Sequence, residues 1–193
     1  MDATSPDRGA GLLPAPNRPE LEQLARKLKQ VALLEGDFVL HSGARSRFYF
    51  DKYLMEADPD SLKLVAEALR EILPGEGEFD RLAGVELGGI PLVTALSLST
   101  SLPALFVRQG RKEYGTAKQI EGNFSPGERV VLVEDVVTTG KAALEAIGVI
   151  RQEGLEVVRV VAVVDRESGA TERFAAAGIP YRFLFTLSYL LSL

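Results

Sequence analysis

The chain has 193 residues, 46% of them hydrophobic and 25% charged, which is typical of one soluble globular domain. Its net charge of -5 and pI near 5.1 argue against a nucleic-acid surface, because phosphate-backbone binding needs clustered Lys and Arg. Cysteine is absent, which excludes disulfides and thiolate metal sites, and neither a membrane-spanning apolar run nor a signal pattern is found, so we expect a cytoplasmic protein.

The N-terminal part predicts a leader, a helix and a hairpin. Residues 1–19 hold four prolines and two glycines without periodicity, which indicates a disordered leader. Residues 37–53 form two strand-like runs around Ser42-Gly43-Ala44, the pattern of a β-hairpin. Between them, a helix from Glu20 would end at Gly36, with these apolar residues on one face: Leu21, Leu24, Ala25, Leu28 and Val31.

The predicted hairpin is the most aromatic stretch of a chain in which 7% of residues are aromatic. Its aromatic side chains alternate with Arg45 and Arg47, an arrangement that would suit stacking on a flat anionic heterocycle. The alternative is a hairpin whose aromatic side chains simply cover the core, and composition alone favours this alternative slightly.

Strands and helices alternate along the rest of the chain. Such alternation is typical of an α/β fold with a doubly wound, mostly parallel sheet and right-handed crossovers. We expect a small N-terminal hood over residues 20–58 and a core over residues 59–193, both within one domain. Strands are expected at 82–85, 104–107, 130–133, 157–164 and 181–187, and helices at 59–73, at 90–102, from 142 onward and up to 178.

The most informative stretch is 129–142. Val130–Val133 form an unbroken apolar run that suits a central parallel strand, and Glu134 and Asp135 stand where that strand should end. Because neighbouring side chains on a strand point to opposite faces, two useful adjacent acids imply that the chain is already turning there. Thr138-Thr139-Gly140 then leads into a helix, and a loop before a helix N-terminus suits a phosphate.

Carboxylates beside this loop suit sugar hydroxyls or Mg²⁺ rather than phosphate. Together, the acids and the loop fit a ribose 5-phosphate. The alternative is a solvated acidic turn capped by threonines. Any two of these features often occur together in such a turn, but all of them in this order are uncommon.

Three other loops carry candidate binding residues. Gly88-Gly89 follows the strand at 82–85, and adjacent glycines let the backbone approach a ligand closely, although they also suit an ordinary turn. In residues 108–122, basic side chains are spaced irregularly among glycines. This pattern suits a mobile lid over a pyrophosphate, and it also suits a charged loop that is simply solvated. Arg166 follows the strand at 157–164, where it could pair with the carboxylate of a ligand or with a surface acid.

These motifs carry a resemblance to a known family. Residues 134–140, Glu-Asp-Val-Val-Thr-Thr-Gly, resemble the phosphoribosyl pyrophosphate (PRPP) signature of the type I phosphoribosyltransferases. Three further segments resemble the orotate phosphoribosyltransferases within that family: Phe-x-Leu-x-Ser-Gly-x-x-Ser at 38–46, Lys-Glu-Tyr-Gly-Thr at 112–116 with Ile-Glu-Gly at 120–122, and Asp-Arg-x-x-Gly at 165–169. The resemblance implies the type I phosphoribosyltransferase fold and the transfer of 5-phosphoribosyl from PRPP to orotate, which gives orotidine 5'-monophosphate and pyrophosphate in pyrimidine biosynthesis.

The resemblance also implies roles for individual residues. Lys112, Glu134 and Asp135 would be catalytic, with Lys112 donated to the neighbouring subunit of a homodimer. Mg²⁺ would be held mainly by PRPP, with no firm protein ligand. PRPP would be bound by Arg108, Lys112, Tyr114, Leu87, Gly88, Glu134, Asp135, Val136, Val137, Thr138, Thr139, Gly140, Lys141 and Ala142. Orotate would be bound by Thr138, Arg166, Tyr49 and Phe50.

Some positions depart from the family pattern. Relatives often carry lysine where this chain has His41, Gly88 and Gln109, and small residues where it has Lys141-Ala142. Two rival functions stay open at this point, a purine-base phosphoribosyltransferase and a PRPP-sensing regulator that binds nucleic acid. The acidic balance of the chain and the Lys112 loop argue against the regulator.

Overall fold

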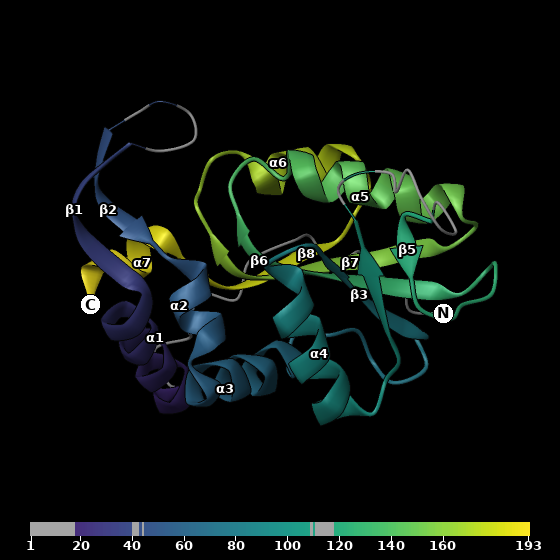
Figure 1. Ribbon diagram of the computed structural model, residues 1–193, viewed down its shortest axis with the longest axis horizontal. Coiled ribbons are helices and arrows are strands. Elements are labelled where there is room, and N and C mark those ends of the chain that lie inside the picture. Colours follow the sequence, from purple (N-terminus) through teal and green to yellow (C-terminus); the bar gives the residue numbers. More distant parts are fainter. Residues whose placement is uncertain (1–17, 40–42, 44, 109, 111–117) are drawn as a thin grey trace, which may run out of the picture.

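The computed structural model describes residues 18–39, 43, 45–108, 110 and 118–193. Its centre is a sheet that, in this described part of the chain, has six strands in the order β5-β4-β3-β6-β7-β8. All neighbours pair in parallel except β5, which runs antiparallel to β4 at one edge, so the predicted α/β fold with a mostly parallel sheet is confirmed (Figure 1). The strands are β3 (Arg81–Val85), β4 (Ala104–Val107), β5 (Ile120–Glu121), β6 (Arg129–Val137), β7 (Glu156–Asp165) and β8 (Tyr181–Thr186).

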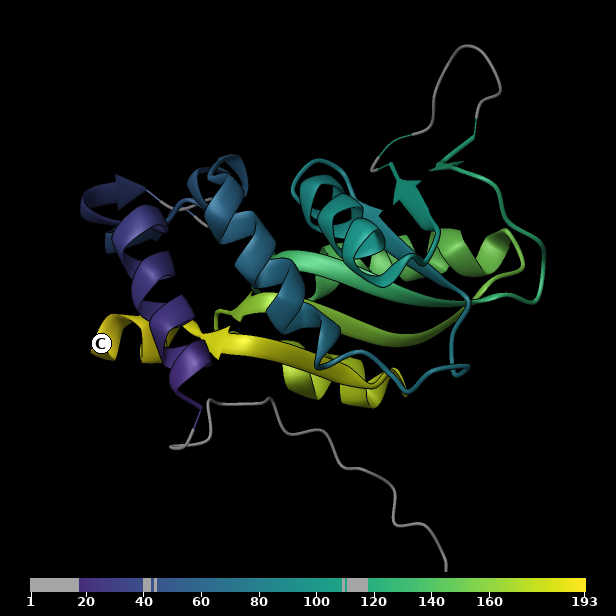
Figure 2. The same ribbon diagram turned by 90° about the horizontal axis from the view of Figure 1, so that it is seen from below.

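Helices cover both faces of this sheet. α3 (Pro59–Arg70) and α4 (Gly89–Thr100) lie on one face, and α5 (Lys141–Gln152) and α6 (Ala170–Ala176) lie on the other (Figures 1 and 2). A parallel strand between two helical layers must be apolar on both sides, and Val130–Val133 of β6 are fully buried. Within the described ranges, no helix is long and apolar enough to cross a membrane.

The hood is built from α1 (Pro19–Ala32), β1 (Leu33–Val39), β2 (Arg45–Phe50) and α2 (Lys52–Ala57). Figure 1 shows it at one end of the sheet, and α7 (Leu187–Ser192) from the C-terminal end of the chain lies beside it. The predicted hairpin is confirmed, because β1 and β2 pair antiparallel, while residues 40–42 and 44 at its tip lie outside the described residues.

Several predicted boundaries are wrong. α1 ends at Ala32 instead of Gly36, because the chain continues into β1, and Ala32 rather than Val31 is buried. The second hairpin strand stops at Phe50, since the Asp51 side chain accepts a hydrogen bond from the Tyr53 backbone N–H and caps α2. The helices α2 and α7 and the edge strand β5 were not predicted, because elements of two to six residues are too short to show a period.

Candidate active site

The two acids of β6 lie on opposite faces of the sheet. β6 stays paired with β7 as far as Val137 opposite Asp165, so the expectation that the chain turns at Glu134 and Asp135 is wrong. From Val131 to Val137 the ladder to β7 has no register shift, and neighbouring side chains therefore alternate there. Glu134 points to the side of α5, and Asp135 to the side of α4 and the hood.

The loop after β6 encloses a small hollow at the start of α5. This hollow has a volume of about 140 Å³, and Glu134 forms part of its wall. Gly140 precedes α5 with φ +74°, and a Cβ atom there would lie 3.0 Å from the Phe174 ring, so glycine is favoured. Within the described chain no side chain caps this helix start, which leaves backbone N–H groups for an anion. The other residues that line the hollow are Val136, Val137, Thr138, Thr139, Lys141, Ala142 and Ala143.

A second loop, between β3 and α4, approaches Asp135 from across the strand. The peptide bond between Glu86 and Leu87 is cis, and the Leu87 side chain is exposed. Gly88 lies directly against Asp135, since a Cβ atom built on it would fall 1.6 Å from Asp135 Oδ2. The predicted pyrophosphate loop and the predicted ribose acid therefore meet at one point.

Two hood residues that sequence reasoning missed complete this cluster. Lys52 Nζ lies 2.6 Å from Asp135 Oδ2, and the Glu56 carboxyl is buried nearby. Burial, followed by the negative charge of Asp135, raises the pKa of Glu56 to about 8. The same two causes, in the same order, raise the pKa of Glu134 to about 8. The Asp51 cap was the signal that could have shown that a helix begins at Lys52.

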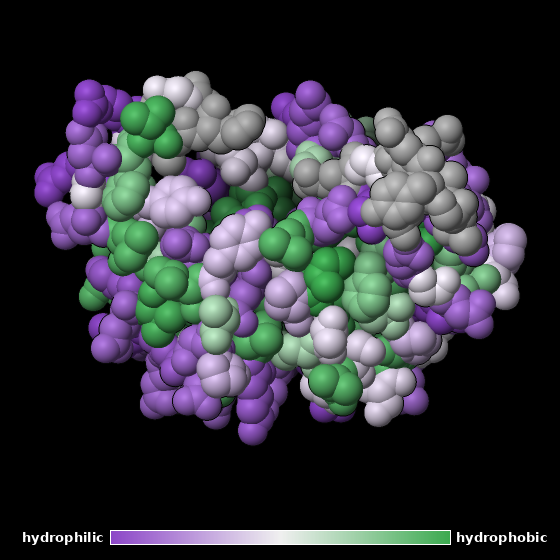
Figure 3. Space-filling view, in the orientation of Figure 1, coloured by the Kyte–Doolittle hydropathy of each residue, from purple (hydrophilic) through white to green (hydrophobic). Residues whose placement is uncertain are grey.

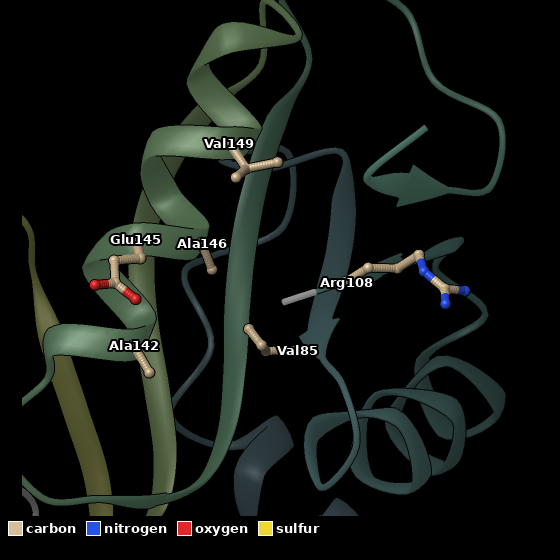
Figure 4. Close-up of a pocket in the computed structure, with 6 residues that line it drawn as sticks. All are labelled: Val85, Arg108, Ala142, Glu145, Ala146 and Val149. Carbon is tan, nitrogen blue, oxygen red and sulfur yellow. The ribbon is translucent and has the colours of Figure 1, made fainter. Parts of the chain in front are cut away.

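Arg108 stands at the base of the predicted cationic loop. Its backbone N–H donates to the Gln119 carbonyl at 2.9 Å, which closes the base of that loop. A cavity of about 190 Å³ lies between Arg108 and helix α5, with Ala142 and Glu145 on the far side (Figure 4). Figure 4 shows the Arg108 side chain extending away from α5, so its guanidinium is not directed at the hollow after β6. Lys112 and Tyr114 lie outside the described residues.

The predicted orotate residues occupy different environments. The Arg166 backbone N–H donates to the Val137 carbonyl at 2.8 Å, which fixes Arg166 beside the loop that contains Thr138. Tyr49 is 40% exposed and its ring pairs with Phe38 at a centroid distance of 5.5 Å. Phe50, on the other face of β2, packs against the core, so Tyr49 and Phe50 do not share a surface.

The surface between the hood and the sheet is hollowed. Figure 3 shows this depression, with hydrophobic and hydrophilic side chains mixed around it. Within the described ranges, no three His, Cys, Asp or Glu side chains form a group that could hold a metal ion. The acids in the described part of this end of the sheet thus stand apart from one another and do not form a metal cage.

Comparisons with known proteins identify the family to which this chain belongs. Residues 55–176 match the phosphoribosyl transferase domain family. An orotate phosphoribosyltransferase from Natronomonas pharaonis is 45% identical over 157 residues, which cover 81% of this chain and 88% of that protein. The crystal structure of orotate phosphoribosyltransferase from Aeropyrum pernix matches with a TM-score of 0.79 at 38% identity, covering 88% of this chain and 96% of that one.

The Mycobacterium tuberculosis H37Rv orotate phosphoribosyltransferase in complex with PRPP matches with a TM-score of 0.75 at 31% identity, covering 89% of this chain and 99% of that one. These relatives span most of the present chain and most of their own length. The chain therefore belongs to the orotate phosphoribosyltransferases, within the phosphoribosyl transferase domain family.

Proposed function

We propose that this chain transfers the 5-phosphoribosyl group of PRPP to orotate, giving orotidine 5'-monophosphate and pyrophosphate for UMP synthesis. The observation that carries this proposal is the hollow at the start of α5, which combines free helix N–H groups with the Glu134 carboxyl in its wall. An anion-binding helix start and a hydroxyl-binding acid side by side fit a sugar phosphate.

In this proposal, the backbone of residues 136–142 holds the 5'-phosphate of PRPP. Glu134 and Asp135 accept hydrogen bonds from the ribose hydroxyls, one from each side of β6. The loop at Leu87 and Gly88 offers backbone donors to the pyrophosphate. Because these groups stand on the ends of rigid strands, they fix the sugar in one orientation, which lowers the entropic part of the barrier.

The reaction breaks the bond between the ribose C1' and the pyrophosphate oxygen, and the electron pair leaves with pyrophosphate. A nitrogen of ionised orotate forms the new bond to C1', so no dedicated general base is required. Positive charge develops on the sugar ring, as in other glycosyl transfers. We assign Arg166 to the orotate carboxylate, and Thr138 and the exposed Tyr49 to the ring, whereas Phe50 packs against the core and is not assigned to it.

Two cationic residues would complete the site from a second copy of the chain. We propose a cytoplasmic homodimer in which the Lys112 loop of one subunit, with Arg108 and Tyr114, reaches the pyrophosphate of the other. The resemblance of residues 112–116 to the family loop supports this arrangement, and the direction of the Arg108 side chain, away from its own phosphate hollow, agrees with it. Cations delivered to a leaving group stabilise the transition state, where its charge grows.

We further propose that Mg²⁺ enters with PRPP. The separate acids of the described site suit a cation that keeps substrate oxygens and water as most of its ligands. When bound, it would neutralise charge on the pyrophosphate. Because Glu134 and Asp135 point to opposite faces of β6, we assign neither carboxylate as a ligand of this ion.

The deciding experiment follows the absorbance of orotate after mixing the protein with PRPP and Mg²⁺. A PRPP-dependent loss of orotate absorbance is expected, and parallel assays with adenine, hypoxanthine and uracil should show no product. Turnover of a purine base in place of orotate would identify a purine phosphoribosyltransferase. PRPP binding without any turnover would contradict the enzyme and favour a regulator.

A further inference from the structure

Lys52 links the hood to the acid pair of β6. Its Nζ atom lies 2.6 Å from Asp135 Oδ2, with the Asp135 side chain 5% exposed and that of Lys52 32% exposed. The hairpin pair Arg47–Glu35, by contrast, is 81% and 66% exposed. Exposed pairs contribute little because water screens them, whereas a buried carboxylate depends on its partner. The Lys52–Asp135 contact is therefore an ion pair through which the hood can set the charge and orientation of the Asp135 carboxylate.

This contact fixes the Asp135 carboxylate before any substrate arrives. Oδ1 accepts a hydrogen bond from the Val136 backbone N–H, and Oδ2 faces the Lys52 ammonium. A carboxylate has about four lone-pair directions, so these two contacts do not use all of its acceptor positions. Holding an acceptor in its working orientation beforehand removes an ordering cost from substrate binding.

The arrangement needs glycine at position 88. A Cβ atom on Gly88 would lie 1.6 Å from Asp135 Oδ2 and 2.9 Å from Lys52 Nζ. The ammonium thus occupies the space above the Gly88 loop, although it comes from α2 and not from the loop itself. No side chain at position 88 could hold Asp135 in this orientation and leave room for Lys52.

Glu56, one helical turn after Lys52, keeps this ammonium available to Asp135. Glu56 is 7% exposed, and among the described residues neither of its carboxyl oxygens has a hydrogen-bond partner. The charged groups that face it are Lys52 and Asp51 from the hood and Asp135 from β6. Since burial and Asp135 raise the pKa of Glu56 to about 8, it is neutral at pH 7 and does not compete for the ammonium.

Lys52 itself stays charged at neutral pH. Burial lowers the pKa of Lys52, but the charge of Asp135 and the hydrogen bond to it outweigh burial, so the net shift is upward. One ammonium and one neutral acid therefore surround the Asp135 carboxylate on the hood side.

We propose that Lys52 is a positioning residue for PRPP, which holds Asp135 over Gly88 in the orientation that receives the ribose hydroxyls. This inference rests on the proposed PRPP site. If the Lys52–Asp135 pair only held the hood against the core, removing Lys52 would lower thermal stability without a selective effect on PRPP binding.

The first test compares K52M, K52R and wild type, with K63M as the matched control because Lys63 is exposed on α3. Steady-state assays with orotate give KM for each substrate, and calorimetry gives the Kd of PRPP with Mg²⁺. K52M should raise the KM and Kd of PRPP by about tenfold to a hundredfold, the range for one charge-assisted hydrogen bond. The KM of orotate should change by less than about twofold, and K52R should recover most of the PRPP affinity.

A double-mutant cycle with D135N tests whether Lys52 acts through Asp135. If it does, K52M should weaken PRPP binding far less in the D135N background than in wild type. Equal loss in both backgrounds would overturn the positioning role. Circular dichroism and thermal melting of each variant identify any variant that has not folded, and K52R then provides the comparison.

PRPP affinity measured over a pH series should change if Glu56 competes for Lys52, but not if the Lys52–Asp135 pair is purely structural. As Glu56 ionises above about pH 8, it should compete for Lys52, so PRPP affinity of wild type should fall relative to E56Q between pH 7 and pH 9. Superimposable profiles would overturn the role of Glu56. An active wild type with K52M equal to K63M would overturn the inference alone, whereas an inactive wild type would overturn the proposed function instead.

Discussion

Gly88 lies so close to Asp135 that a Cβ atom at position 88 would come within 1.6 Å of the Asp135 Oδ2 atom. Gly88 lies in the loop after β3 and Asp135 lies within β6, and the two meet because β3 and β6 are neighbouring parallel strands. A side chain at position 88 would displace the Asp135 carboxylate from its present position, and the cation that lies there comes from the hood. Substitutions at this contact should therefore affect function before they affect stability.

The first prediction concerns Gly88→Ala. The added methyl group should push the Asp135 carboxylate out of its present rotamer and lower kcat/KM for PRPP by about a hundredfold, the cost expected for a displacement near 1 Å in an active site. Orotate turnover at varied PRPP measures the effect. An unchanged kcat/KM would mean that the Asp135 orientation is not required.

Gly148→Ala is the matched control and a prediction of its own. Gly148 is exposed within α5, and a Cβ atom there would meet nothing within 4 Å. Alanine in a helix interior is more favourable than glycine by about 0.5–1 kcal/mol, so the free energy of unfolding should rise by that amount. Urea or thermal unfolding checks the gain, and orotate turnover should equal that of wild type.

Glu134→Gln should give a pH-dependent defect. With a pKa of about 8, the Glu134 carboxyl is mostly protonated at pH 7 and ionised at pH 9. Glutamine imitates the protonated acid, so the ratio of wild-type to variant kcat/KM should be small at pH 7. It should grow to about tenfold at pH 9, because a charged acceptor binds a hydroxyl group more strongly. A ratio that is the same at both pH values would contradict the assignment of Glu134 to the ribose.

Glu56→Gln should stabilise the fold at high pH only. The folded state holds the Glu56 proton up to a pKa of about 8, whereas the unfolded state releases it near pH 4.5, so wild-type stability falls as pH rises between these values. Glutamine has no such loss. It should raise the free energy of unfolding at pH 8.5 by about 1–3 kcal/mol, the cost of an unpaired buried polar group, and change it little at pH 5.

Thermal melts at pH 5 and pH 8.5 check this difference, at roughly 2–4 °C for each kcal/mol in a chain of this size. The exposed Glu67 on α3 provides the control variant E67Q. A stabilisation of the same size at both pH values would show that the effect of E56Q is not linked to the proton.

Arg166→Gln should impair orotate binding selectively. The backbone of Arg166 is fixed beside the phosphate loop by its N–H bond to Val137, and we assign its guanidinium to the orotate carboxylate. Losing a charge-assisted pair with the orotate carboxylate should raise the KM of orotate by about tenfold to a hundredfold and leave the Kd of PRPP nearly unchanged. The exposed Arg173 of α6 serves as control through R173Q, and an equal loss for PRPP would contradict the assignment.

Local sequence patterns determined much of this protein. The apolar run Val130–Val133, the turn residues after it and the alternation of strands and helices correctly predicted a mostly parallel α/β sheet with β6 at its centre. The motif residues also led to the orotate phosphoribosyltransferases, which the comparisons confirm. These features are readable because burial and turn formation depend on residues that are neighbours in the chain.

Tertiary structure decided how the site residues face one another. The sequence placed Glu134 and Asp135 side by side, but the ladder between β6 and β7 keeps the strand regular and sends them to opposite faces. Lys52 and Glu56 lie on a six-residue helix that has too few turns to display a period, so only the Asp51 cap could have indicated it. Their meeting with Asp135 depends on where the hood packs on the sheet, and a contact between residues far apart in the chain is set by strand order and packing, which local patterns do not encode.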